Sequence, residues 1–244
     1  MAVEDTHSQS ETVKITKVES EEEIERCFEV MSLAFGKDKP MFNSMYPEHD
    51  TTEGRRNGTN RLREMWQSKR DDVDFHYLKA TIANQIAGFA IWTIMTPTKN
   101  LESEKAEEEF NLKAMYPDQP LAQEWLRQIW PIYITQRRDV VLADSQDDRP
   151  VIALELCAVR PDMQRKGVGV LLSSWGVQYG KENGIREAVL EASIAGVGCY
   201  TKAGFAHQSP IDFGPVDRSL TQVRNFPTIV FMRTGPLQTE QKDV

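Results

Sequence analysis

Residues 154–169 read LELCAVRPDMQRKGVG, and this stretch carries more structural information than any other part of the chain. Its first six residues are mostly apolar, as in a buried strand, and Pro161 then introduces a bend. A basic loop with two glycines follows and leads directly into the apolar pattern of a helix. This order predicts an anion site, because the first N–H groups of a helix lack intrahelical acceptors and the helix dipole adds partial positive charge there.

The loop itself has the residues that a pyrophosphate group requires. Gly167 and Gly169 carry no Cβ atom to hold an anion away from the backbone, and Arg165 and Lys166 add formal positive charge. A plain strand-to-helix turn with solvated cations is the alternative interpretation. Two common phosphate motifs are absent, since the chain has no G-x-x-x-x-G-K-S/T sequence and the loop lacks the third glycine of a dinucleotide fingerprint.

The same stretch resembles the acetyl-CoA loop of the GNAT superfamily of N-acetyltransferases, in which Q/R-x-x-G-x-G/A follows a strand and a V-x-P segment. The V-x-P segment corresponds to residues 159–161. The loop pattern is filled without a gap by Gln164, Arg165, Lys166, Gly167, Val168 and Gly169. The resemblance implies that the preceding strand bulges and that its backbone binds the pantetheine arm of CoA through Cys157, Ala158 and Val159. It implies a further CoA contact from Ser193, where many relatives carry Asn.

Glu155 is the candidate general base. A carboxylate inside an apolar strand is costly unless it is paired or functional, and the resemblance implies a base on this strand. An alkylammonium with a pKa of about 10.4 must lose a proton before its nitrogen can attack a thioester. A structural ion pair with an arginine is the alternative role for Glu155. Strand alternation places its side chain on the same face as Ala153 and Cys157.

Tyr200 is the candidate general acid. Residues 200–205, YTKAGF, resemble the Y-x-x-x-G-F signature of the same superfamily. The resemblance implies direct transfer without a covalent enzyme intermediate, in which backbone N–H near Val159 stabilises the oxyanion and Tyr200 protonates the departing thiolate. An aromatic core residue on a short helix is the alternative interpretation.

Length and composition predict a single domain. The 244 residues, 40% of them hydrophobic, are enough to bury a full core. We expect a disordered tail at 1–11, one N-acetyltransferase domain at 12–236 with a helical insertion at 97–149, and a C-terminal tail at 237–244. No apolar run reaches the roughly 20 residues of a membrane span, and the first residues lack the apolar core of a signal peptide. The sequence therefore predicts a cytoplasmic protein that contacts no membrane.

Charge and metal-ligating residues argue against several other classes. The formal net charge of −8 disfavours a nucleic-acid surface, which would need a basic stripe. Cys27, Cys157 and Cys199 form no C-x-x-C pair and are expected to be reduced thiols. The four histidines form no metal-ligand pattern, so no metal is expected.

Apolar periodicity predicts alternating helices and strands. Strands are expected at residues 13–18, 75–82, 86–95, 151–159, 188–192, 205–213 and 228–233. Helices are expected at residues 21–35, 55–69, 168–183 and 196–203, with an acidic helix at 101–110 and an amphipathic helix at 121–141 inside the insertion. Residues 40–54 are expected to form a loop, and Gly88 suggests a bend or the close approach of another group. The resemblance implies the GNAT fold, an α/β (α+β) fold whose central mixed twisted sheet of about six to seven strands is flanked by helices, with the helical insertion before the fourth strand.

Together these features predict an acetyl-CoA-dependent N-acetyltransferase, of a fungal-type small-molecule kind and a monomer or homodimer. The expected acceptor is the primary amine of a small molecule: an amine, a polyamine or an amino-acid-like metabolite. The alternatives are a protein lysine or N-terminus as acceptor and, in another class, a catalytically silent acyl-CoA-binding sensor. Candidates for the acceptor pocket are the aromatic residues and methionine at Met41, Phe42, Tyr46, Trp66, Trp92, Trp125 and Trp130. Each of these is also a candidate core residue.

Overall fold

A seven-stranded sheet forms the centre of the computed structural model, which describes residues 12–143 and 149–238. The strands lie in the spatial order β1-β2-β3-β4-β5-β7-β6. Their bounds are β1 Lys14–Lys17, β2 Phe75–Ile82, β3 Gln85–Met95, β4 Val151–Val159, β5 Glu187–Ser193, β6 Ala206–Pro210 and β7 Ile229–Arg233. Neighbouring strands are antiparallel except β4 and β5, which are parallel. This mixed sheet, flanked by helices, confirms the predicted fold class.

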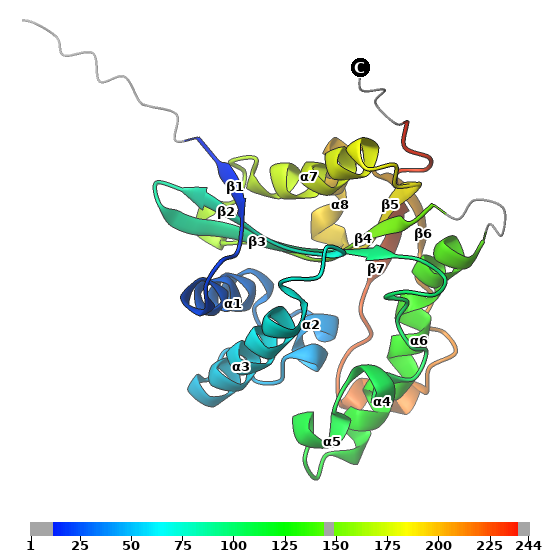
Figure 1. Cartoon of the computed structure of the whole chain (residues 1–244). Coiled ribbons are helices and arrows are strands. Elements are labelled where there is room, and N and C mark those ends of the chain that lie inside the picture. Colours follow the sequence, from blue (N-terminus) through cyan, green and yellow to red (C-terminus); the bar gives the residue numbers. More distant parts are fainter. Residues whose placement is uncertain (1–11, 144–148, 239–244) are drawn as a thin grey trace, which may run out of the picture.

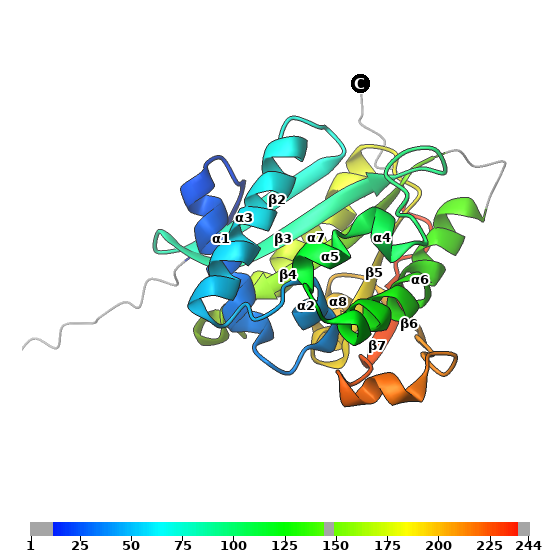
Figure 2. The ribbon, with the colours of Figure 1, turned by 90° about the horizontal axis from the view of Figure 1, so that it is seen from below.

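Helices cover both faces of the sheet. They are α1 Glu21–Phe35, α2 Pro40–Met45, α3 Thr52–Lys69, α4 Ala106–Glu109, α5 Leu112–Met115, α6 Pro120–Leu142, α7 Val168–Glu182 and α8 Val197–Lys202. Figure 1 shows α7 over one face, with α1, α3 and α6 on the other. Figure 2 looks at this second face, where α3, α5 and α6 lie in front of the strands. Each described helix is too short or too polar to span a lipid bilayer.

The helix that follows the basic loop packs unusually close to β3. A Cβ atom on Gly88 would lie 2.7 Å from Val168 Cγ1, so this glycine marks the close approach that its place in a strand suggests. Further along α7, Gly176 has no side chain, and the ring of Trp92 fills the space that a side chain would occupy. The Trp92 indole N–H donates to the carbonyl oxygen of Leu172 at 3.2 Å. These contacts fix the first turn of α7 beside the end of β4.

Several segments differ from the predicted elements, among them residues 211–213, which were expected in a strand and lie beyond the end of β6. Residues 40–54 contain helix α2, which begins with Pro40 at its first position, where proline is favoured, and is held by stacking of Phe42 on Phe35 at 4.3 Å. The expected acidic helix at 101–110 is reduced to α4. Residues 101–105 form no regular structure instead, and the Ser103 N–H donates to the Glu109 carboxylate while the Ser103 carbonyl accepts from the Trp130 indole at 2.8 Å.

The described C-terminal end of the chain packs against the domain beyond residue 236. Leu237, the first residue of the expected C-terminal tail, is buried and donates its N–H to the Arg186 carbonyl at 2.8 Å. The expected tail at 1–11 and residues 239–244 lie outside the described residues. The three cysteines are free thiols, as predicted.

His76 makes folding stability depend on pH. It is buried on β2 against the rings of Trp175 and Tyr179 on α7, at 5.0 and 4.6 Å between centroids, and neither ring nitrogen has a hydrogen-bond partner among the described residues. Burial lowers its pKa to about 4. An unfolded histidine binds a proton below about pH 6.5, so this group removes stability as the pH falls from about 6.5 to 4. Urea denaturation of His76→Phe should therefore show a shallower loss of unfolding free energy over that range.

The matched control for this prediction is His207→Gln, since His207 lies exposed on β6. We expect the control to follow the wild-type pH curve. Parallel curves for wild type and His76→Phe would show that His76 does not carry the acid sensitivity.

Candidate active site

β4 and β5 pair along only part of their length. Their parallel ladder runs from Val151↔Glu187 to Leu154↔Leu190, although β4 continues to Val159 and β5 to Ser193. Beyond the last pair the two strands separate, so the sheet has an open gap at the end that leads into the basic loop. Main-chain groups on the edges of such a gap are free to bind a ligand.

A β-bulge lies where the gap begins. On the β3 side, Ile91 pairs with Leu156 but the next residue, Trp92, pairs with Leu154, so Glu155 has no partner. Glu155 therefore points to the α6 side together with Ala153, whereas Cys157 packs into the core beneath α7. The expectation that Glu155 and Cys157 share a face is wrong, because a bulge shifts the alternation by one residue.

A cleft of about 460 Å³ opens at this gap and brings several predicted residues together. Tyr200, Glu155, Cys157 and Ser193 all line it. Other walls come from α2, α6 and the segment before β7. The further lining residues include Phe35, Asp38, Tyr133, Glu191, Ile194 and Phe226.

The predicted acceptor residues divide into two groups. Met41 and Phe42, on α2, line the cleft. The other five lie in hydrophobic clusters away from the cleft lining: Tyr46, Trp66, Trp92, Trp125 and Trp130. The predicted set thus includes the α2 residues of the cleft wall but not Tyr133, which lines the cleft from α6.

Tyr200, on α8, is held in place by residues just before and just after that helix. A Cβ atom on Gly196 would lie 2.7 Å from Tyr200 Cε2, and Phe205 meets the ring edge-on at 6.3 Å between centroids. Burial first, then the nearby Cys157 and Cys199 thiols, raise the pKa of Tyr200 well above its ordinary value. The hydroxyl therefore keeps its proton at physiological pH and is available as a donor.

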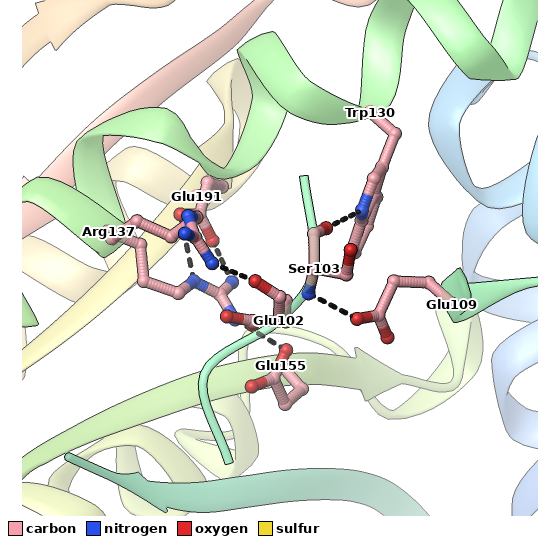
Figure 3. A network of polar contacts seen from close by, with 8 residues as sticks. Glu102, Ser103, Glu109, Trp130, Arg137, Glu155 and Glu191 are labelled. Carbon is pink, nitrogen blue, oxygen red and sulfur yellow. Dashed lines mark hydrogen bonds and ion pairs between the residues drawn. The ribbon is translucent and has the colours of Figure 1, made fainter. Parts of the chain in front are cut away.

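Arg137 is the site residue that sequence reasoning missed. Its guanidinium is buried, with a side-chain exposure of 2%, and reaches Glu155 from α6 (Figure 3). Nη1 donates to Glu155 Oε2 at 2.6 Å and to Glu102 Oε1 at 2.7 Å, while Nε and Nη2 both donate to the Glu191 carboxylate. The sequence held a weak indication that Arg137 is buried, because it lies on the same face of the helix as the apolar residues Ile134 and Val141.

The arginine occupies one oxygen of Glu155 and leaves the other available. Glu155 Oε1 has no hydrogen-bond partner in the described ranges, and the side chain is 29% exposed in the lining of the cleft. Glu102 differs: it lies outside the cleft lining, and burial raises its pKa to about 7. Of the carboxylates around Arg137, Glu155 is thus the most accessible to an incoming amine.

The basic loop presents a concave set of backbone donors. Arg165 and Gly167 have positive φ angles of 62° and 83°, and this alternation turns successive N–H groups toward one side. Within the described part of the chain, the N–H groups of residues 165–170 have no hydrogen-bond acceptor. The Gln164 side chain folds back and donates to the Val159 carbonyl at 3.2 Å. Such an arrangement binds phosphate oxygens well.

The end of β4 directs further N–H groups into the gap. Arg160 donates its N–H to the Ala87 carbonyl on β3 at 2.9 Å, and bonding toward one neighbour alternates along an antiparallel strand. Ala158 therefore bonds to β3, while the N–H groups of Cys157 and Val159 point toward the gap. A Cβ atom on Gly169 would lie 2.9 Å from Cys199 Sγ, so the missing side chain of Gly169 also lets the start of α7 pack against α8.

Residues 40–205 match the sequence profile of the acetyltransferase (GNAT) family. The chain belongs to the GNAT family. It is thus an acyltransferase of the kind that uses acetyl-CoA.

Solved structures of other GNAT proteins share the fold at low sequence identity. Arylalkylamine N-acetyltransferase 2 from Aedes aegypti is 16% identical, with a TM-score of 0.64 over 92% of this chain and 99% of that one. An agmatine N-acetyltransferase variant is 11% identical, with a TM-score of 0.58 over 91% and 97%. A Corynebacterium glutamicum structure described as histone acetyltransferase HPA2 and related acetyltransferase is 16% identical, with a TM-score of 0.53 over 96% and 99%. No curated protein sequence matches the chain.

Gly167 allows a direct test of the loop. Alanine at this φ of 83° has room for its Cβ but is strained by about 1 kcal/mol or more, and relief of that strain turns the loop N–H groups away from a bound anion. We expect Gly167→Ala to raise the Kd for acetyl-CoA by about tenfold, which corresponds to about 1.4 kcal/mol. Isothermal titration calorimetry measures this change.

Gly184 provides the matched control, because its φ is 69° and its Cβ position is also open. Gly184→Ala should lose similar folding stability and keep the wild-type Kd. Equal Kd values for both variants would contradict the loop assignment.

Proposed function

We propose that this chain transfers the acetyl group of acetyl-CoA directly to the primary amine of a small molecule. The observation that carries the proposal is that a single cleft, at the gap between β4 and β5, is lined by both Glu155 and Tyr200. A base for the amine and an acid for the leaving thiolate are the two groups that direct transfer needs.

The chain's own residues supply each part of this reaction. The accessible oxygen of Glu155 accepts the proton of the acceptor ammonium. The N–H of Val159 donates a hydrogen bond to the thioester oxygen as negative charge develops on it. The hydroxyl of Tyr200 donates its proton to the departing sulfur as the carbon–sulfur bond breaks, and the second proton of the attacking nitrogen restores the tyrosine hydroxyl. Apolar surroundings favour this last step, since burial raises the pKa of the neighbouring Cys157 thiol to about 12 and makes a thiolate more basic here.

The donor-binding roles follow from the same geometry. The N–H groups and cations of residues 164–169 bind the pyrophosphate. The backbone of residues 157–159 binds the pantetheine arm along the gap, and the Ser193 hydroxyl adds a contact from the β5 side, where it lines the cleft.

The shape and charge of the cleft support a small cationic acceptor. Its volume of about 460 Å³ lies in the range of small-molecule pockets. Of the charged side chains that line it, three are carboxylates (Asp38, Glu155 and Glu191) and one is a cation (Lys39). Arg137 pairs with two of the carboxylates, and aromatic rings from Phe42 and Tyr133 offer faces to a cation. Structural neighbours are named for arylalkylamine and agmatine acetylation, which are reactions of small amines.

Release of free thiol from acetyl-CoA tests the proposal. The assay compares arylalkylamines, polyamines and amino acids with a lysine-containing peptide, and the small amines are expected to give the higher kcat/KM. A preference for the peptide would favour protein acetylation. Tight acetyl-CoA binding with no thiol release from any acceptor would favour a catalytically silent sensor.

A further inference from the structure

Arg137 lies where β4 and β5 stop pairing. The last parallel pair is Leu154↔Leu190, and the next residue on each strand is a glutamate, Glu155 on β4 and Glu191 on β5. Both carboxylates are bonded to the same guanidinium. The arginine belongs to α6, inside the helical insertion, so the insertion contacts both edges of the gap through this side chain (Figure 3), in addition to lining the cleft with Tyr133.

All three nitrogens of the guanidinium donate hydrogen bonds to carboxylates. Nε and Nη2 form a two-pronged contact with Glu191, whose side chain is 1% exposed, and Nη1 reaches Glu155 at 2.6 Å from its other side. Glu102, also from the insertion, accepts from Nη1 at 2.7 Å. A planar group with donors on two edges sets the distance between the carboxylates that it joins.

We propose that Arg137 is a positioning residue that fixes the separation of β4 and β5 and so keeps the pantetheine slot open before acetyl-CoA arrives. The inference rests on the proposed use of the gap as the donor site. A fixed slot requires no rearrangement when the donor binds, and it holds the carboxylate of Glu155 at the edge of the cleft.

A lysine at this position retains the charge but not the geometry. Its ammonium is a point charge that does not provide the two-edged contact of a guanidinium, so the two strands lose their fixed spacing while the buried carboxylates keep a cation. Arg137→Lys is therefore the informative variant. Deletion of the cation would instead leave buried carboxylates uncompensated and destabilise the fold.

The test compares two ligands in calorimetric titrations. CoA occupies both the loop and the slot, whereas its nucleotide part, 3′-phospho-ADP, reaches only the loop. For Arg137→Lys we expect the Kd for CoA to rise by about tenfold or more, and the Kd for the nucleotide to change by less than about twofold. Equal weakening of both ligands, or of neither, would overturn the proposal.

Two further variants complete the test. Arg138→Lys is the matched control, because Arg138 is the next residue of α6 and bonds to the Glu102 carbonyl and to Glu104, outside the gap. It should bind both ligands as wild type does. Glu191→Gln removes the charge on the β5 side and should reproduce the selective loss for CoA, so it decides the question if Arg137→Lys does not fold.

Hydrogen exchange of the ligand-free protein separates this inference from the proposed function. Backbone amides at 155–159 and 191–193 are expected to exchange faster in Arg137→Lys than in wild type, and amides of α3 are not. Unchanged exchange at these residues would overturn the positioning role even in an active enzyme. A wild-type chain that bound no CoA would contradict the proposed function, while the exchange result would still report on Arg137.

Discussion

Replacement of Tyr200 by phenylalanine is expected to lower kcat by about 10²-fold while the Kd for acetyl-CoA changes by less than about twofold. The ring would keep its packing against Gly196 and Phe205, so the variant removes only the hydroxyl. Without that proton donor, the sulfur must leave as a charged thiolate in buried, apolar surroundings. Single-turnover measurement of thiol release gives kcat, and calorimetry gives the Kd.

The pH dependence adds a second readout. Because burial keeps the pKa of Tyr200 well above its ordinary value, the wild-type rate should show no loss from tyrosine ionisation below about pH 10. Tyr179→Phe is the control for removal of a hydroxyl, since Tyr179 lies on α7 beside His76 and away from the cleft lining. A Tyr200→Phe enzyme with wild-type turnover would remove this residue from the mechanism.

Replacement of Glu155 by glutamine is expected to lower kcat/KM by about 10²-fold at pH 7 and to change its dependence on pH. With the carboxylate present, the bound ammonium can transfer its proton inside the site. Without it, only the free amine reacts, so kcat/KM should rise about tenfold per pH unit until the acceptor pKa of about 10.4. Wild type should stay nearly flat over the neutral range. The measurement is kcat/KM for one amine from pH 6 to pH 10.

Glu102→Gln is the matched control for this prediction. Glu102 and Glu155 accept from the same Nη1 atom of Arg137, but only Glu155 lines the cleft. If Glu155 serves only as an ion pair, both variants should show the flat pH dependence of wild type. A slope in Glu155→Gln alone would assign the base.

The strand, loop and helix around the basic loop could be predicted from the sequence because they depend on local order. A strand, a bend, two glycines and a helix are consecutive, and each has a conformational preference that appears in the residues themselves. The helices and strands around residues 151–202 accordingly agree with the predicted ranges within one to two residues. Local sequence also pointed to Glu155, because a carboxylate inside an apolar strand must be paired or functional, and the structure shows it paired with Arg137.

The acceptor side could not be predicted in the same way because it is assembled from distant segments. Arg137 stands 18 residues before Glu155 and 54 before Glu191, and nothing near it in the sequence indicates either partner. The bulge depends on the pairing of β4 with β3, so strand alternation alone gave the wrong face for Cys157 relative to Glu155. The helix at Pro40–Met45 is short and is fixed by tertiary stacking rather than by helix propensity.

The contact between Gly169 and Cys199 has a consequence for how this enzyme can diversify. It joins the first turn of α7, the proposed phosphate site, to α8, which carries Tyr200, with no room for even a methyl group between them. A substitution that moves the loop at residues 164–169 would therefore also move Tyr200. The cleft walls at Met41, Tyr133 and Phe226 come from other segments, so new acceptors can be accommodated there while the donor half stays the same.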